Sequence, residues 1–174
     1  ADAGCRTFFV MSLAEAITIR RALDDAGYTK TRIFTLGGCH PGQEDDFLAF
    51  RINPVINSIK QLRRLVATGR SWDAAIHVDT GMTRLGLDRG ELDTLKTVME
   101  DAGEDEDNAL GPINPCLLMS HLTASEDPHD DASARQLAAF TKLRELFPGI
   151  PASLGNSGGI LLGGDYRFDM TRPG

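Results

Sequence analysis

The sequence predicts an α/β protein whose fold is an incomplete (β/α)₈ barrel of the TIM type. Three observations support this expectation. Short runs of strand-forming residues alternate with segments of helical periodicity along the 174 residues, and parallel strands are the kind that need crossover helices. Polar residues follow the strands, where a barrel carries its chemistry. A complete barrel needs eight units and roughly 250 residues, so the seven or so units found here form only part of one.

The first two strands and the helix between them have clear boundaries. Residues 8–13 (FFVMSL) form the first expected strand, and Ser12 with Glu15 has the spacing of a helix capping box. Apolar residues then recur at helical intervals until Gly27, which is typical of a helix end. Residues 32–36 (RIFTL) are the second expected strand.

The alternation continues through the middle of the chain. A short helix is expected within residues 42–50, and a third strand within residues 53–56. Pro54 fits best near the start of that strand, because proline cannot donate a hydrogen bond to a sheet. Apolar residues over 59–66 predict the next helix, which ends at Gly69.

The remaining elements complete about seven units. A fourth strand is expected at 74–78, and Asp88 is the expected N-cap of a helix that runs to Ala102 and stops at Gly103. The other expected elements are strands at 116–120, 152–154 and 167–170 and helices at 137–147 and 158–162. An open doubly wound sheet is the alternative architecture, although the sequence lacks the G-x-G-x-x-G turn of its dinucleotide-binding form.

Composition excludes several classes of protein. With 25 acidic against 18 basic residues and a net charge of −7, the chain is unsuited to neutralising nucleic-acid phosphates. No apolar run approaches the ~20 residues of a membrane span. Cys5, Cys39 and Cys116 form neither a disulfide framework nor a zinc motif. We therefore expect a cytoplasmic protein without a metal site, a nucleic-acid partner or a membrane partner.

Polar groups follow four separate strands of the expected barrel. Arg84 lies in a glycine-framed loop, His121 follows a strand directly, Asn156 and Ser157 begin a helix, and Arg172 follows the last strand. Two cations, an imidazole and a helix N-terminus suit a phosphorylated, anionic ligand. Each residue also has an ordinary explanation, as a surface cation, a structural histidine, a helix cap or half of an ion pair. Spacing alone leaves these alternatives open.

Four motifs together resemble the alanine racemases that depend on pyridoxal 5′-phosphate (PLP). They are HVDTGMTRLGL at 77–87, SHLTASE at 120–126, NSGG at 156–159 and DMTRPG at 169–174. The motifs occur in the family's order and cover nearly the whole chain. The resemblance implies the N-terminal (β/α)₈ domain of a racemase, from its second strand to its eighth. It implies an isomerase that interconverts L-alanine and D-alanine for peptidoglycan synthesis in the cytoplasm, as a homodimer.

The same resemblance implies roles for the residues at the strand ends. Arg84 would contact the phenolic oxygen of PLP and help place the substrate carboxylate. His121 would pack against the pyridine ring. Asn156 and Ser157 belong to the family's phosphate loop, and Ser157 with the backbone of Gly174 would hold the phosphate.

Arg172 would face the pyridine nitrogen. A guanidinium only donates hydrogen bonds and stays charged at working pH. A pyridine nitrogen that faces it is therefore an unprotonated acceptor, and the cofactor is a weaker electron sink. Fewer side reactions such as transamination would follow, which suits a reaction that removes and returns one proton.

The sequence also departs from the family pattern. The family's Schiff-base lysine belongs to the first barrel strand, and its second base is a tyrosine in a C-terminal β-domain of the other subunit. Neither motif occurs within residues 1–174. We therefore expect residues 1–174 to be a partial PLP-binding barrel, without the first strand and the C-terminal β-domain, that is inactive by itself. His77 stands where many relatives have a lysine that can be carbamylated, a modification that histidine cannot carry.

Two other functions fit the same resemblance. One is a non-catalytic PLP-binding barrel of the cofactor-homeostasis type, and the other is a racemase for another amino acid such as serine. The spacing from Gly81 to Arg84 and the closing Arg172 favour the racemase over the homeostasis type. We expect Arg84, His121, Ser157 and Arg172 to lie at one end of the barrel around a cavity. The side chains of His121 and Arg172 should be within hydrogen-bond reach.

Overall fold

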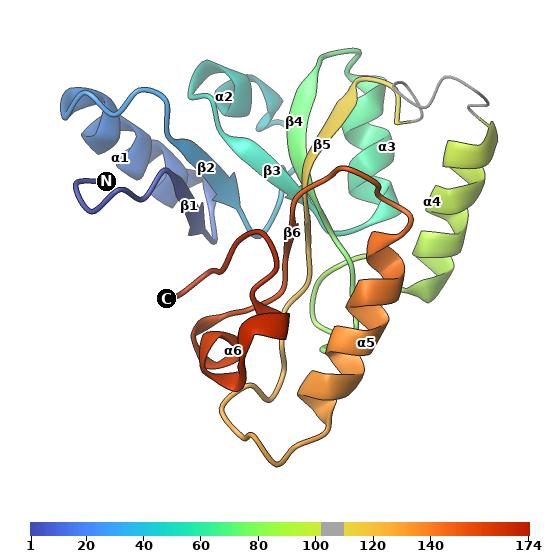
Figure 1. Ribbon diagram of the computed structural model, residues 1–174. Coiled ribbons are helices and arrows are strands. Elements are labelled where there is room, and N and C mark those ends of the chain that lie inside the picture. Colours follow the sequence, from blue (N-terminus) through green and yellow to red (C-terminus); the bar gives the residue numbers. More distant parts are fainter. Residues whose placement is uncertain (102–109) are drawn as a thin grey trace.

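Six parallel strands form one sheet, in the chain order β1-β2-β3-β4-β5-β6, in a computed structural model that describes residues 1–101 and 110–174 (Figure 1). The strands are β1 (Thr7–Val10), β2 (Arg32–Thr35), β3 (Asn53–Ile56), β4 (Trp72–His77), β5 (Ile113–Met119) and β6 (Ala152–Ser153). The helices are α1 (Leu13–Asp25), α2 (Glu44–Ala49), α3 (Ile59–Ala67), α4 (Arg89–Asp101), α5 (Ala132–Arg144) and α6 (Ser157–Leu162). A sheet of neighbouring parallel strands joined by helices is the wall of a (β/α)₈ barrel, so the expected fold is confirmed as a half-barrel.

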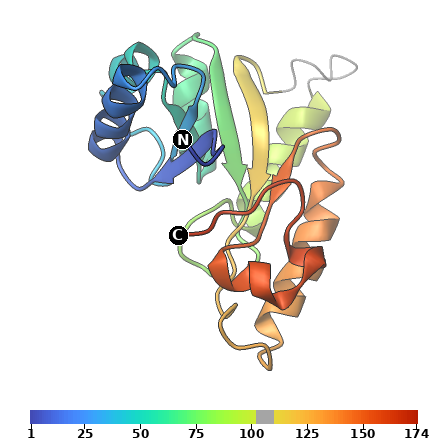
Figure 2. The same ribbon diagram turned by 60° about the vertical axis from the view of Figure 1, so that its left-hand side comes forward.

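The two faces of the sheet carry separate apolar clusters, because successive strand residues point to opposite sides. One cluster joins strand residues to the helices and includes Ile33, Ile56, Ile76, Leu118, Leu62 and Phe140. The other contains Phe34, Val55, Ala75, Leu117 and Met119, all of them strand residues. The second cluster therefore marks the concave, inner face of the half-barrel. Figure 2 shows the strands as a curved wall between α1 on one flank and α5 on the other.

The caps predicted from the sequence are formed. Ser12 Oγ accepts a hydrogen bond from the backbone N–H of Glu15 at 3.4 Å, and the Glu15 carboxylate accepts one from the N–H of Ser12 at 3.2 Å. Asp88 Oδ1 likewise accepts from the N–H of Glu91 at 2.9 Å at the start of α4. Glu91 also accepts from the N–H of Ile59 at 2.9 Å, so this cap ties the starts of α3 and α4 together.

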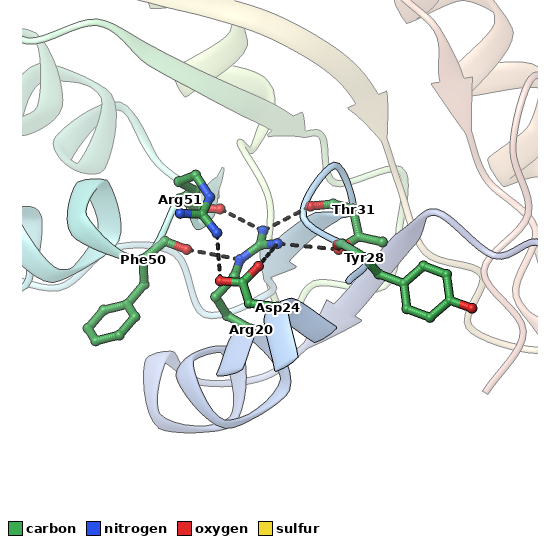
Figure 3. Close-up of polar contacts among 6 residues, drawn as sticks. All are labelled: Arg20, Asp24, Tyr28, Thr31, Phe50 and Arg51. Carbon is green, nitrogen blue, oxygen red and sulfur yellow. Dashed lines mark hydrogen bonds and ion pairs between the residues drawn. The ribbon is translucent and has the colours of Figure 1, made fainter. Parts of the chain in front are cut away.

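Arg20 anchors α1 at the end of the sheet where the strands begin (Figure 3). Its side chain is 2% exposed. Nε donates to the carbonyl of Phe50 at 3.1 Å, and Nη2 donates to the carbonyls of Thr31 at 2.9 Å and Arg51 at 3.0 Å. Because these carbonyls belong to the turns before β2 and β3, one buried guanidinium joins the helix to two strand starts.

The prediction of a seventh strand at residues 167–170 is wrong. A 3₁₀ turn at Gly164–Tyr166 precedes this segment, and Phe168 has a positive φ of 49°, which interrupts an extended strand. The N–H groups of Asp169 and Met170 both donate to the carbonyl of Ala152, at 3.1 and 3.3 Å. Two donors on one carbonyl do not make the evenly spaced ladder of a parallel strand. The segment therefore runs beside β6 without continuing the sheet.

Smaller differences have local causes. The first strand ends at Val10 rather than at residue 13, because Ser12 is the cap of α1. The expected helix end at Ala102 and Gly103 lies outside the described residues. Within residues 1–101 and 110–174, no helix combines the length and the apolar character needed to cross a membrane.

Candidate active site

The candidate site residues follow the carboxyl ends of β4, β5 and β6. Because these strands are parallel neighbours, their carboxyl ends meet at one edge of the sheet. The segment that carries Arg172 returns to the same edge, where its N–H donates to the carbonyl of Gly155 at 2.9 Å. The topology thus places Arg84, His121, Ser157 and Arg172 at the predicted end of the half-barrel.

The loop that carries Arg84 is held by its own polar groups. Asp79 Oδ1 accepts hydrogen bonds from the N–H groups of Gly81 at 2.9 Å and Thr83 at 3.0 Å. Gly86 returns the loop with a φ of +109°, and a Cβ there would lie 2.8 Å from the nitrogen of Asp79, so only glycine fits. Arg84 lies on the exposed part of the loop. Within the described part of the chain it makes no hydrogen bond with the other candidate residues.

His121 lies two residues beyond Met119, an inner-face residue, and is half-buried. Burial lowers the pKa of His121, and the positive charges of Arg172 and Arg84 lower it further. The imidazole is therefore neutral at neutral pH. A neutral ring can pack against an aromatic ligand without adding to the positive charge of the site.

Arg172 is held in place by protein acceptors. Its guanidinium donates to Ser153 Oγ and to the carbonyl of Ser120, and more weakly to the carbonyl of Leu154 at 3.5 Å. The guanidinium carbon also lies 5.9 Å from the centre of the Phe9 ring on β1. None of these hydrogen bonds goes to His121, so the expected contact between the two side chains is not formed. Burial lowers the pKa of Arg172 to about 10, so the side chain keeps its charge at neutral pH.

Ser157 and Gly174 come together at the start of α6. Ser157 Oγ lies 3.0 Å from both the nitrogen and the carbonyl oxygen of Gly174, so the hydroxyl accepts from one and donates to the other. Asn156 caps the helix instead, because its Oδ1 accepts from the N–H of Gly159 at 2.9 Å. A Cβ at Gly158 would lie 2.5 Å from Ser125 Oγ, so the neighbouring loop presses directly on this turn. Ser157 and Gly174 thus form a small cradle at this edge of the sheet, in which each is the hydrogen-bond partner of the other.

His77 is fixed in one neutral form on the inner face of β4. Its Nδ1 lies 2.7 Å from Oδ1 of Asn57. The amide of Asn57 donates to the carbonyls of Leu36 at 2.8 Å and Val55 at 3.2 Å, which can only accept, so Oδ1 must be the atom that faces the ring. Nδ1 therefore carries the proton. Burial and the charge of Arg172 lower the pKa of His77 to about 4.

Sequence reasoning missed Asn57, Thr80, Ser120 and Gln136, which support this edge of the sheet. For Gln136, the available signal was a polar residue at a core-facing position of a helix. The buried side chains of α5 are Ser133, Gln136 and Phe140. The stripe expected from the sequence began one residue later, at Leu137, and so passed over Gln136.

The whole chain, residues 1–174, matches the family model described as "Alanine racemase, N-terminal domain". The chain belongs to the alanine racemase family. Among curated alanine racemases, the protein of Methylobacterium nodulans is 44% identical over 99% of this chain. The "Alanine racemase, catabolic" of Agrobacterium fabrum is 39% identical, also over 99% of the chain.

A solved alanine racemase has the same arrangement of elements. The crystal structure from Bartonella henselae, with covalently bound pyridoxal phosphate, superposes with a TM-score of 0.85 at 32% identity over 99% of this chain. The chain spans 48% of that structure, and 44% and 42% of the two curated racemases. Residues 1–174 thus correspond to somewhat less than half of a whole alanine racemase.

Proposed function

We propose that this chain is the cofactor-binding barrel of a PLP-dependent alanine racemase, an isomerase that interconverts L-alanine and D-alanine. The observation that carries the proposal is the family match over all of residues 1–174. The meeting of Ser157 and Gly174, at the same sheet edge as three further candidate residues, agrees with it.

The residues present fit PLP. Ser157 Oγ and the amide of Gly174 would hold the phosphate, with Asn156 keeping the turn in shape as the cap of α6. His121, neutral and half-buried, would lie against the pyridine ring. When bound, PLP withdraws the electron pair left at Cα after a proton is removed.

Arg172 would face the ring nitrogen of PLP and keep it unprotonated. The guanidinium has only donors, and its bonds to Ser153 and to the carbonyl of Ser120 keep it in one place. Its pKa of about 10 means that it does not release a proton at neutral pH. The barrel would therefore limit how strongly the bound cofactor withdraws electrons.

Arg84 would bind the substrate carboxylate and the phenolic oxygen of PLP. Because its loop is exposed, Arg84 is accessible to a substrate that arrives from solvent. His77 and His121 are both neutral at neutral pH. The cations that act on these two histidines are Arg84 and Arg172. Negative charge on a ligand would therefore be met mainly by guanidinium groups.

The wider setting of the protein is also a proposal. We place residues 1–174 as most of an N-terminal barrel, whose first strand and C-terminal β-domain are supplied elsewhere in a longer chain that works as a cytoplasmic homodimer. Its three cysteines are free, which suits a reducing compartment. The D-alanine would serve peptidoglycan synthesis. One of the relatives is named a catabolic alanine racemase.

The test is a racemisation assay on the full-length gene product. Purified protein with PLP should convert L-alanine to D-alanine far faster than free PLP does, and should convert L-serine more slowly. Growth of a racemase-deficient bacterium without added D-alanine would test the peptidoglycan role. A full-length protein that binds PLP and leaves alanine unchanged would contradict the racemase and favour the cofactor-homeostasis type.

A further inference from the structure

Gln136 is a buried polar residue on the face of α5 that packs against the sheet. Its side chain is 2% exposed, as is that of Ser133 one turn earlier. A buried amide needs partners for both its N–H groups and its carbonyl oxygen. For Gln136, those partners come from the two loops that carry Arg84 and His121.

On the side of His121, Gln136 holds the backbone in both directions. Oε1 accepts from the N–H of Thr123 at 2.9 Å, and Nε2 donates to the carbonyl of His121 at 2.8 Å. A carbonyl only accepts and a backbone N–H only donates, so the amide can take just one orientation. The segment from His121 to Thr123 is therefore clamped to α5.

On the side of Arg84, the same nitrogen reaches the loop after β4. Nε2 donates to Thr80 Oγ1 at 3.3 Å, which leaves Thr80 its own proton to share with Ser120 Oγ at 2.7 Å. A Cβ at Gly81 would lie 3.7 Å from Cγ of Gln136, so the loop also packs on the side chain. Gln136 therefore supports the start of the loop that leads to Arg84, through its contacts with Thr80 and Gly81.

Ser120 extends this connection to Arg172. Its carbonyl accepts from the Arg172 guanidinium, and its hydroxyl bonds Thr80. Arg172, the backbone of His121 and the start of the loop that carries Arg84 are therefore linked through one group of hydrogen bonds. Within this group, Gln136 contacts the loop after β4 and the segment after β5, and Ser120 contacts Thr80 and Arg172.

We propose that Gln136 is a positioning residue that sets the separation of Arg84 and His121 across the site. It touches neither the proposed cofactor nor the substrate, and acts through Thr80, His121 and Thr123. The inference rests on the proposed function. Its physical basis is that a small displacement of a group that orients a reactant lowers the rate steeply.

The decisive variant is Gln136→Glu in the full-length, PLP-loaded protein. The substitution keeps the shape but replaces the donor that faces the His121 carbonyl and Thr80 with an oxygen. We expect kcat/KM for alanine to fall about 10- to 100-fold with PLP retained. The imidazole resonance of His121 should shift, and the amide of Thr123 should exchange faster with solvent. Ser133→Ala, equally buried on the same helix, should change none of these quantities.

Thr80→Val is a second variant that tests the same connection if Gln136→Glu fails to fold. Valine has the shape of threonine without the hydroxyl, so it should lower kcat/KM, whereas Thr80→Ser should restore it. In a folded double variant, the effects of Gln136→Glu and Thr80→Val should be less than additive, because both break one connection.

A folded Gln136→Glu protein with wild-type kcat/KM and an unshifted His121 resonance would overturn the inference. A wild-type protein that binds PLP without racemising alanine would instead overturn the proposed function. In that case the His121 and Thr123 resonances still decide whether Gln136 positions the two loops.

Discussion

At the level of single residues, the candidate site combines arginines that stay charged with histidines that are neutral at neutral pH. Burial lowers the pKa of His77 to about 4 and also lowers that of His121, and the charge of Arg172 adds to both effects. Arg172 keeps its proton because its pKa, although lowered by burial, is still about 10. At neutral pH the two histidines are therefore neutral while Arg172 is charged, which suits the binding of anionic groups.

Substitutions of Arg84 and of Ser157 should have opposite effects on turnover and on cofactor binding. Arg84→Gln should lower kcat about 100-fold or more, because it removes a charged donor from the reacting part of the site, while PLP is retained. Ser157→Ala should do the reverse, weakening PLP binding with near-normal kcat at saturating PLP. Steady-state kinetics and absorbance titration of PLP measure the two quantities. An Arg84→Gln protein with weakened PLP binding but normal kcat at saturating PLP would contradict the role of Arg84. A Ser157→Ala protein with normal PLP binding but lowered kcat would contradict the role of Ser157.

His77 should make the folded protein sensitive to acid. Its pKa is about 4 in the folded protein against the ordinary 6.5, so between these values only the unfolded chain binds the proton. The free energy of unfolding therefore falls as pH drops from 6.5 toward 4, by about 3 kcal/mol for a shift of this size. Arg172, His121, Asp79 and Arg84 are the charged or titratable groups that act on His77.

Urea unfolding of the full-length protein at pH 7.5, above this interval, and at pH 4.5, near its lower end, measures this effect. His77→Gln cannot titrate, so it should remove most of the loss. The exposed His129→Gln is the control and should keep the wild-type difference. Equal differences in wild-type and His77→Gln proteins would refute the assignment.

At the scale of elements, the turn into α6 depends on close packing against the loop after β5. A Cβ at Gly158 would lie 2.5 Å from Ser125 Oγ and 2.7 Å from the Ser125 carbonyl oxygen. Gly158→Ala must therefore push the turn away from its neighbour and spoil the cradle of Ser157. We expect PLP binding to weaken about 10-fold or more, equivalent to roughly 1.4 kcal/mol. Gly164→Ala, where nothing lies within 4 Å, should leave PLP binding unchanged.

The attachment of α1 depends on Arg20 at the opposite end of the sheet (Figure 3). Arg20→Met would leave the buried carbonyl of Thr31 and the partly buried carbonyls of Phe50 and Arg51 without their donor. Each unsatisfied buried group is costly, so we expect a loss of about 3 kcal/mol or more in the free energy of unfolding. Arg21→Met, on the exposed side of the same helix, should cost less than about 1 kcal/mol. Because Arg20 is far along the strands from the site, the kcat of folded protein should not change.

At the level of the whole molecule, residues 1–101 and 110–174 place no lysine at the proposed site. Lys30 lies before β2, at the end of the sheet where the strands begin, and Lys60, Lys96 and Lys142 lie on α3, α4 and α5. The proposed reaction needs two bases on opposite sides of Cα and a lysine that holds PLP covalently. We therefore expect residues 1–174 alone to show no racemisation.

The measurement is D-alanine production from L-alanine with added PLP, together with borohydride trapping of any PLP adduct. The full-length gene product, assayed in parallel, should be active. Turnover by residues 1–174 above that of free PLP, or a trapped adduct on one of the four lysines, would contradict the assignment of the bases to other parts of the protein.

The sequence by itself determined the features that depend on neighbouring residues. Helical periodicity and the caps at Ser12 and Asp88 predict elements that the structure forms, because a capping bond joins groups three residues apart. The alternation of strands and helices predicts a parallel sheet, and a parallel sheet gathers its strand ends at one edge. The placement of Arg84, His121 and Ser157 at that edge follows from this rule.

Tertiary packing sets which distant segments meet and which residues are fully buried. The segment 167–170 has strand-forming residues, but the positive φ of Phe168 and the shared carbonyl of Ala152 prevent a ladder. Gln136 faces the sheet because of how α5 packs. The periodicity of the sequence instead predicted a buried stripe that begins one residue later, at Leu137. Its partners at 80, 121 and 123 are brought together by the pairing of β4 with β5. Hydrogen bonds between residues far apart in sequence depend on that pairing, and no local pattern encodes it.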